Sequence, residues 1–118
     1  MMKKVYILDD DLDFLEMISY VLSKNYTVSQ STELDIPGIC SFNPDLILMD
    51  HGIGLKSSNE IQKKLKEAIP GFDIPIILFS GHHNLPQVAR RPGIAGFIQK
   101  PAGINEVREH LRKFFEAA

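Results

Sequence analysis

The sequence predicts an α/β domain in which a doubly wound, five-stranded parallel sheet lies between two layers of helices. Two observations predict this three-layer fold. Short apolar segments that end in polar residues alternate with segments of helical periodicity, and the alternation repeats about five times along the chain. A chain of 118 residues has room for one hydrophobic core. We therefore expect a single domain over residues 1–118, with no output domain in this chain.

Five short segments have the composition of strands. Four of them are nearly continuous apolar runs, as in parallel strands that are buried on both faces. These runs cover residues 5–8, 45–50, 74–80 and 95–100. Pro75 stands near the start of its run, where a strand tolerates proline. Residues 26–30 alternate in polarity and predict a weaker strand at the edge of the sheet.

Apolar residues spaced three and four apart predict helices between the strands. The predicted helices cover about residues 12–24, 58–69 and 104–115, with a short helix within residues 33–43. Asp11 stands where an N-cap of the first helix is expected. Residues 82–93 are harder to assign, because Pro86 and Pro92 bracket residues 87–91 and leave space for at most a turn and a half of helix.

Composition excludes several classes of protein. Thirteen basic and 15 acidic residues nearly balance, so the basic excess of a nucleic-acid-binding domain is missing. No apolar run approaches the roughly 20 residues of a membrane span, and the N-terminus does not read as a signal peptide. We expect a cytoplasmic protein that contacts neither nucleic acid nor membrane. Cys40 is the single cysteine, and its apolar neighbours predict a small core residue.

Polar residues follow four of the predicted strands where each strand ends. They are Asp9, Asp10, Asp50, Ser80 and Lys100. The carboxyl ends of parallel strands share one edge of the sheet, and ligands bind there. Clustered carboxylates need an opposite charge, and Mg²⁺ prefers oxygen ligands of this kind. With an amine and a hydroxyl beside them, the carboxylates predict phosphoryl transfer onto an aspartate.

Four motifs in this order resemble the receiver domains of response regulators in two-component signalling, and the resemblance covers the full length. The motifs lie at residues 6–11 (YILDDD), 44–50 (PDLILMD), 75–81 (PIILFSG) and 97–101 (FIQKP). The likeness is to a single-domain, chemotaxis-type receiver. It implies a flavodoxin-like receiver fold with strand order 2-1-3-4-5.

The resemblance also implies roles for particular residues. Asp50 matches the phosphoacceptor of the family. Asp9 and Asp10 match the acidic pair that holds Mg²⁺ together with Asp50, and Gly52 matches the residue whose carbonyl completes the metal site. The implied cofactor is therefore Mg²⁺.

Three further residues match the catalytic and switching positions of the family. Lys100 matches the lysine that contacts the phosphoryl group, and the Lys100–Pro101 peptide bond matches one that is usually cis. Ser80 matches the switch hydroxyl, and Phe97 matches the aromatic residue that moves inward when that hydroxyl is recruited.

The resemblance implies a signalling protein that catalyses its own phosphorylation and dephosphorylation at Asp50, rather than a conventional enzyme. Its implied partners are a histidine kinase or histidine phosphotransfer protein as the donor, and a downstream protein target. Phosphotransfer from the phosphohistidine would switch the conformation through Ser80 and Phe97.

Two alternatives stay open. Gly54 and Ser58 depart from the residues that are common after the acceptor, and residues 80–100 are short for the family. The two glycines close to Asp50, Gly52 and Gly54, predict a more flexible loop. These departures are compatible with a receiver-like binding module that no longer cycles. The sequence also admits a phosphatase of the haloacid-dehalogenase type, in which Asp9 rather than Asp50 is the nucleophile.

Overall fold

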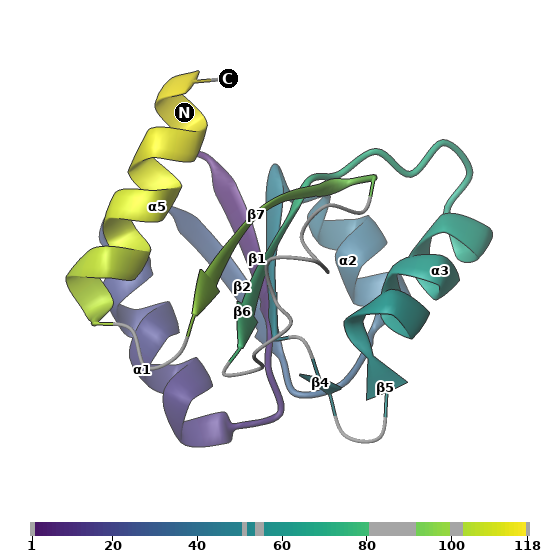
Figure 1. Ribbon diagram of the computed structural model, residues 1–118, viewed down its shortest axis with the longest axis horizontal. Helices are drawn as coiled ribbons and strands as arrows, with labels where there is room; N and C mark the ends of the chain where they lie inside the picture. Colours follow the sequence, from purple (N-terminus) through teal and green to yellow (C-terminus); the bar gives the residue numbers. More distant parts are fainter. Residues whose placement is uncertain (1, 51, 54–55, 81–91, 100–102, 118) are drawn as a thin grey trace.

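A five-stranded parallel sheet forms the centre of the structure (Figure 1). The computed structural model describes residues 2–50, 52–53, 56–80, 92–99 and 103–117. The strands are β1 (Lys4–Leu8), β2 (Thr27–Ser31), β3 (Leu46–Asp50), β6 (Ile76–Ser80) and β7 (Ile94–Gln99). Their order across the sheet is β2-β1-β3-β6-β7. Counted within this sheet alone, that is the predicted order 2-1-3-4-5, and the prediction is confirmed.

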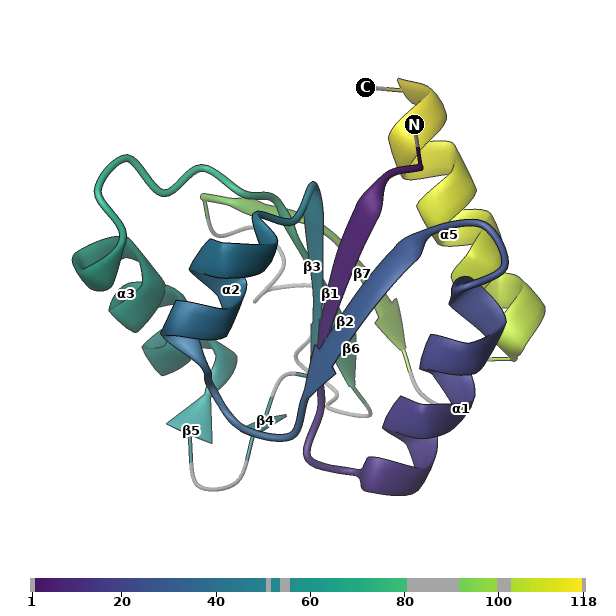
Figure 2. The ribbon, with the colours of Figure 1, turned by 180° about the vertical axis from the view of Figure 1, so that it is seen from behind.

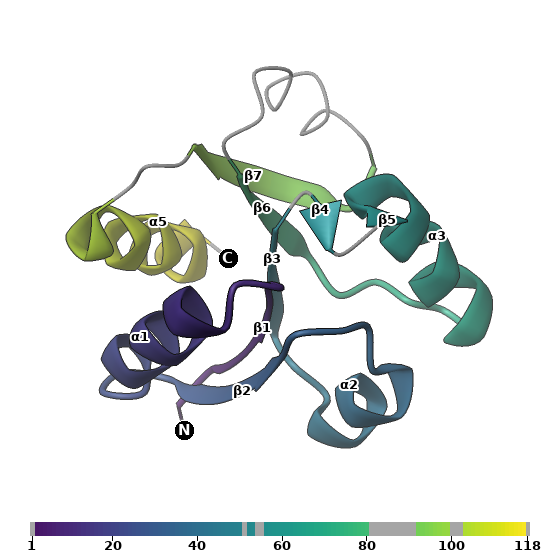
Figure 3. The ribbon, with the colours of Figure 1, turned by 90° about the horizontal axis from the view of Figure 1, so that it is seen from below.

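Helices cover both faces of the sheet, as Figures 2 and 3 show. Helices α1 (Leu12–Leu22) and α5 (Ile104–Ala117) lie on one face, and α2 (Ile36–Phe42) and α3 (Ser58–Ala68) lie on the other. The predicted three-layer, doubly wound architecture is therefore confirmed. None of the helices in the described ranges has the length and apolar character that crossing a bilayer requires.

The central strands are apolar on both faces because each face has its own helical layer to pack against. In β1, Val5 and Ile7 belong to the core cluster under α1 and α5. Their neighbours Tyr6 and Leu8 belong to the cluster under α2 and α3. Alternate side chains of a strand point to opposite faces, so continuous apolar runs are needed here. Strand β2 is only partly buried and lies at an edge of the sheet, as predicted.

Local interactions set where the elements begin and end. Asp11 caps α1 as predicted, since its side chain accepts a hydrogen bond from the Phe14 amide. Asp35 caps α2 in the same way, and Pro37 stands in the first turn, where its missing N–H costs no helical hydrogen bond. Helix α1 ends at Leu22 rather than near residue 24, because a turn at residues 23–25 follows. Strand β6 begins at Ile76, just after Pro75.

One prediction about the core is wrong. Cys40 is exposed on α2 and is not a small core residue. Helix α2 presents the adjacent Ile39, which is fully buried, to the sheet. Consecutive residues of a helix point about 100° apart, so burial of Ile39 turns Cys40 toward solvent.

The chain after β3 forms a short hairpin that the sequence did not predict. Strands β4 (Gly52–Ile53) and β5 (Lys56–Ser57) pair antiparallel, with Gly52 opposite Ser57. Ser57 then caps α3, because its hydroxyl accepts a hydrogen bond from the Glu60 amide. Of the segment 82–93, which the sequence left ambiguous, only Pro92 and Gly93 lie within the described residues.

Stability should fall at high pH because of Tyr6. Burial raises the pKa of this hydroxyl above its ordinary value, the charge of Asp35 adds to the rise, and a hydrogen bond with Ser31 opposes it. A raised folded-state pKa gives stability that is complete below the unfolded pKa, about 10, and is lost as pH rises through the folded value. Urea unfolding from about pH 8 to 11 should show this loss in the wild type and a weaker loss in Tyr6→Phe. The exposed Tyr20→Phe is the matched control, and equal curves for the two variants would contradict the assignment.

Candidate functional site

Parallel register brings the ends of three strands together at one edge of the sheet. Leu8 pairs with Met49 on β3, and Asp50 pairs with Phe79 on β6. Asp9 and Asp10 follow directly on β1, whereas Asp50 is the last residue of β3. Figure 3 looks onto this edge. The residues that precede the acids in the strands are buried and apolar, and their packing in the core fixes the position of the acidic residues.

The three carboxylates form one cluster. One oxygen from each of Asp9, Asp10 and Asp50 lies within 4.8 Å of the other two. Asp9 is 2% exposed, Asp50 is half-buried and Asp10 is exposed. The backbone N–H of Asp11 donates to Oδ1 of Asp9 at 2.9 Å, and Asp11 in turn caps α1. The turn from β1 into α1 therefore orients Asp9 through backbone geometry.

The donor set of this cluster fits a hard divalent cation. Mg²⁺ binds oxygen atoms at about 2.1 Å, so two of its ligand atoms lie at most about 4.2 Å apart. Oxygen atoms within 4.8 Å of one another need only a small side-chain adjustment to meet that limit. Asp10 is exposed, so it can make such an adjustment without disturbing the core.

The other predicted site residues are described to different extents. Gly52 lies two residues beyond Asp50, at the start of the hairpin. Ser80 ends β6 opposite Gln99 of β7, but its side chain lies outside the described part of the structure. Lys100 and Pro101 also lie outside it, so the predicted lysine contact and cis peptide bond stay predictions. Phe97 is half-buried on β7 and packs against the core cluster under α2 and α3.

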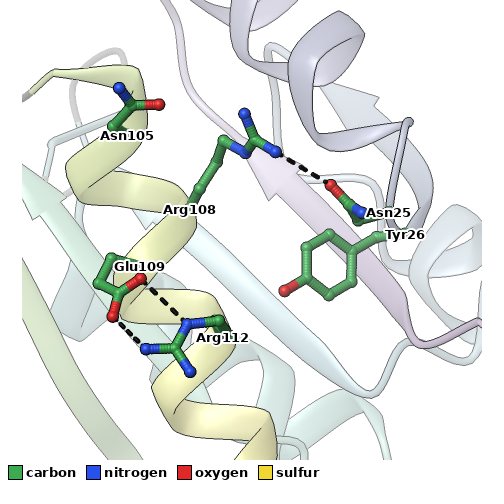
Figure 4. A pocket seen from close by; sticks show the side chains of 6 residues that line it. All are labelled: Asn25, Tyr26, Asn105, Arg108, Glu109 and Arg112. Carbon is green, nitrogen blue, oxygen red and sulfur yellow. Dashed lines mark hydrogen bonds and ion pairs between the residues drawn. The ribbon is translucent and has the colours of Figure 1, made fainter.

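A pocket lies between α5 and the turn before β2, apart from the acidic cluster (Figure 4). The sequence did not predict it. It has a volume of about 520 Å³ and is lined by Asn25, Tyr26, Asn105, Arg108, Glu109 and Arg112. Tyr26 directly precedes β2, which places the pocket toward the amino end of that strand, away from the acids.

The charges around this pocket are largely balanced within α5. Arg112 pairs with both Glu109 and Glu116. The hydrogen bond from Arg112 holds the pKa of the Glu109 carboxyl below its usual range, and the two glutamates raise the pKa of Arg112. The Arg108 guanidinium donates to the side-chain oxygen Oδ1 of Asn25 at 3.4 Å. We therefore place the functional site at the acidic edge of the sheet, where charges of one sign gather.

Comparison with solved structures identifies the fold as that of response-regulator receiver domains. The receiver domain of NtrX from Brucella abortus has a TM-score of 0.80 at 20% identity, covering 97% of this chain and 99% of that chain. For the chemotaxis protein CheY4 of Vibrio cholerae the TM-score is 0.82 at 19% identity, with 96% and 98% covered. For the N-terminal domain of the nisin resistance regulator NsrR it is 0.78 at 27% identity, with 96% and 97% covered.

Comparisons of the sequence alone give no match. No family profile matches it, and a search of curated proteins finds no match. The chain spans nearly all of the isolated receiver domains but only 28% of a longer NtrX chain. At these identities the likeness establishes the receiver fold, and an account of function has to rest on the site residues.

Repulsion within the acidic cluster should be measurable as stability. Two charges about 4 Å apart in a solvent-exposed setting repel by about 1 kcal/mol. With a chelator present to remove divalent cations, Asp10→Asn should therefore raise the free energy of urea unfolding by about 1 kcal/mol at neutral pH. With added Mg²⁺ the wild type should gain more stability than the variant, because the cation binds the folded cluster.

The exposed Asp73→Asn, between α3 and β6, is the control for this measurement. It should respond to Mg²⁺ as the wild type does. An Asp10→Asn variant with unchanged stability in chelator and an unchanged Mg²⁺ response would show that the three carboxylates are not coupled.

Proposed function

We propose that this chain is a phosphoryl-accepting receiver of two-component signalling, in which Asp50 takes a phosphoryl group from a phosphohistidine. The observation that carries the proposal is the convergence of Asp9, Asp10 and Asp50 at the carboxyl edge of a receiver-fold sheet. Ligands of doubly wound folds bind at this edge, and the carboxylates are the oxygen donors that Mg²⁺ prefers.

Asp50 is better placed than Asp9 to act as the nucleophile. Asp9 is 2% exposed and its Oδ1 already accepts the Asp11 amide, whereas Asp50 is half-buried at the end of β3. An oxygen of Asp50 attacks the phosphorus, the P–N bond of the phosphohistidine breaks, and the imidazole nitrogen takes the bonding electrons and a proton. The product is an acyl phosphate on Asp50. Hydrolysis of that bond returns the carboxylate and inorganic phosphate.

The surrounding residues would neutralise charge and orient the phosphoryl group. Asp9, Asp10 and Asp50, with the carbonyl of Gly52, would hold Mg²⁺, which when bound offsets the negative charge of the carboxylates and the phosphoryl oxygens. The Lys100 amine and the Ser80 hydroxyl would donate to phosphoryl oxygens. Phosphoryl transfer needs little beyond such positioning and charge neutralisation.

The conformational signal would pass from Ser80 to Phe97. Strands β6 and β7 pair directly, with Leu78 opposite Phe97 and Ser80 opposite Gln99. Recruitment of the Ser80 hydroxyl by the phosphoryl group would favour an inward position of Phe97, which is half-buried on β7. Phosphorylation then shifts an existing equilibrium between two states.

As such a receiver, the chain would act in the cytoplasm between two protein partners. A histidine kinase or a histidine phosphotransfer protein would supply the phosphoryl group, and a downstream protein would bind the phosphorylated surface. The chain would catalyse only its own phosphorylation and dephosphorylation at Asp50.

Acetyl phosphate with Mg²⁺ should add one phosphoryl group to the wild-type protein, and Asp50→Asn should abolish the addition. Removing the acceptor oxygen leaves no nucleophile at the end of β3. Intact-mass spectrometry after a short incubation measures the addition, and Asp73→Asn should take up as much phosphate as the wild type.

The alternatives predict different masses in the same experiment. A phosphatase of the haloacid-dehalogenase type would still be phosphorylated in Asp50→Asn, at Asp9. A receiver-like binding module would show no addition even in the wild type, under conditions in which a competent receiver is phosphorylated. Either result would overturn the proposed role of Asp50.

A further inference from the structure

Gln62 is a polar side chain on the buried face of α3. It is 4% exposed and follows Ile61, which is fully buried against the sheet. Burying an amide costs free energy unless it finds a hydrogen-bond partner. Nε2 of Gln62 donates to the carbonyl oxygen of Pro92 at 2.6 Å, across 30 residues of sequence. The Gln62 side chain therefore forms a hydrogen bond with a backbone atom of a segment that is distant in sequence.

That backbone atom belongs to a turn whose geometry is held from two sides. Gly93 has φ +88°, a conformation that residues with a side chain rarely adopt, and a Cβ there would lie 2.8 Å from Nε2 of Gln62. The Gly93 carbonyl accepts the backbone N–H of Ile76 at 3.1 Å. The turn is thus bonded to α3 on one side and to the start of β6 on the other.

The two segments joined by Gln62 lead to opposite ends of the proposed switch. In the described part of the segment between Asp50 and α3, the chain forms the hairpin β4–β5. Strand β7 begins at Ile94, directly after the turn, and carries Phe97. Figures 1 and 3 show the start of β7 on the side of the sheet that α3 covers. The hydrogen bond therefore connects the element that follows the acceptor with the strand of the aromatic residue.

We propose that Gln62 is a positioning residue that ties the start of β7 to α3. The tether would couple movement at Asp50 to Phe97, and this coupling rests on the proposed function. A change in the hairpin after Asp50 moves the first turn of α3, and Gln62 lies in the second. Through the Pro92 carbonyl the displacement reaches the start of β7. This route is separate from the one through Ser80, because it enters β7 at its amino end.

Gln62→Met tests the coupling. Methionine is unbranched, similar in size and apolar, so it fills the space of Gln62 and removes the donor. NMR spectra with Mg²⁺ and beryllofluoride report the response of Gly93 and Phe97 to an acyl-phosphate mimic on Asp50. We expect the wild type to shift both resonances, and Gln62→Met to lose the shift at Gly93 and reduce it at Phe97. Phosphoryl uptake from acetyl phosphate should stay at the wild-type level.

Lys63→Met is the matched control, because it places the same side chain on the exposed face of α3 one residue later. It should respond as the wild type does. A Gln62→Met protein in which Gly93 and Phe97 both shift as in the wild type would overturn the inference.

A second measurement uses the wild-type protein alone and does not depend on the variant folding. The side-chain amide protons of Gln62 should exchange with water far more slowly than those of Gln99, which is exposed on β7. Equal exchange of the two amides would overturn the inference. A wild type that takes up no phosphoryl group would instead overturn the proposed function, and slow exchange at Gln62 would still support the tether.

Discussion

The electrostatic cost of gathering three carboxylates at one edge of the sheet is the constraint on which the rest of the structure depends. Asp9, Asp10 and Asp50 repel one another, and a loosely held chain would separate them. The strands prevent separation because the residue before each acidic segment is buried: Leu8 on β1 and Met49 on β3 have essentially no exposed surface. Apolar burial on both faces of the sheet thus offsets the repulsion at its edge. A site that attracts cations is the consequence of that balance.

Much of this arrangement follows from local sequence patterns. Buried parallel strands require apolar side chains on both faces, so β1, β3 and β6 are visible as apolar runs, and the polar residues at their carboxyl ends must share an edge. The strand order was implied by the resemblance to receiver domains and is borne out by the pairing of β1 with both β2 and β3. Asp11 was predictable as a cap because aspartate before a helical period has a local role that does not depend on the rest of the fold.

The features that could not be predicted depend on long-range contacts or on helix rotation. Gln62 looks like a solvent-exposed residue in a charged helix until the Pro92 carbonyl is placed beside it. Cys40 was misplaced because its apolar neighbours suggested burial, whereas the phase of a seven-residue helix decides which of two adjacent residues faces the sheet. The hairpin β4–β5 has only two residues in each strand, too few for a recognisable alternation.

The misplaced cysteine has a practical consequence. Because Cys40 is the sole thiol of the chain and faces solvent on α2, the native sequence offers one attachment point for a maleimide fluorophore or a nitroxide spin label. The label would stand on the same helical layer as α3 and on the face of the sheet against which Phe97 packs. Its rotational freedom or emission would then report rearrangement of that layer in real time, without a mutation at the acidic edge.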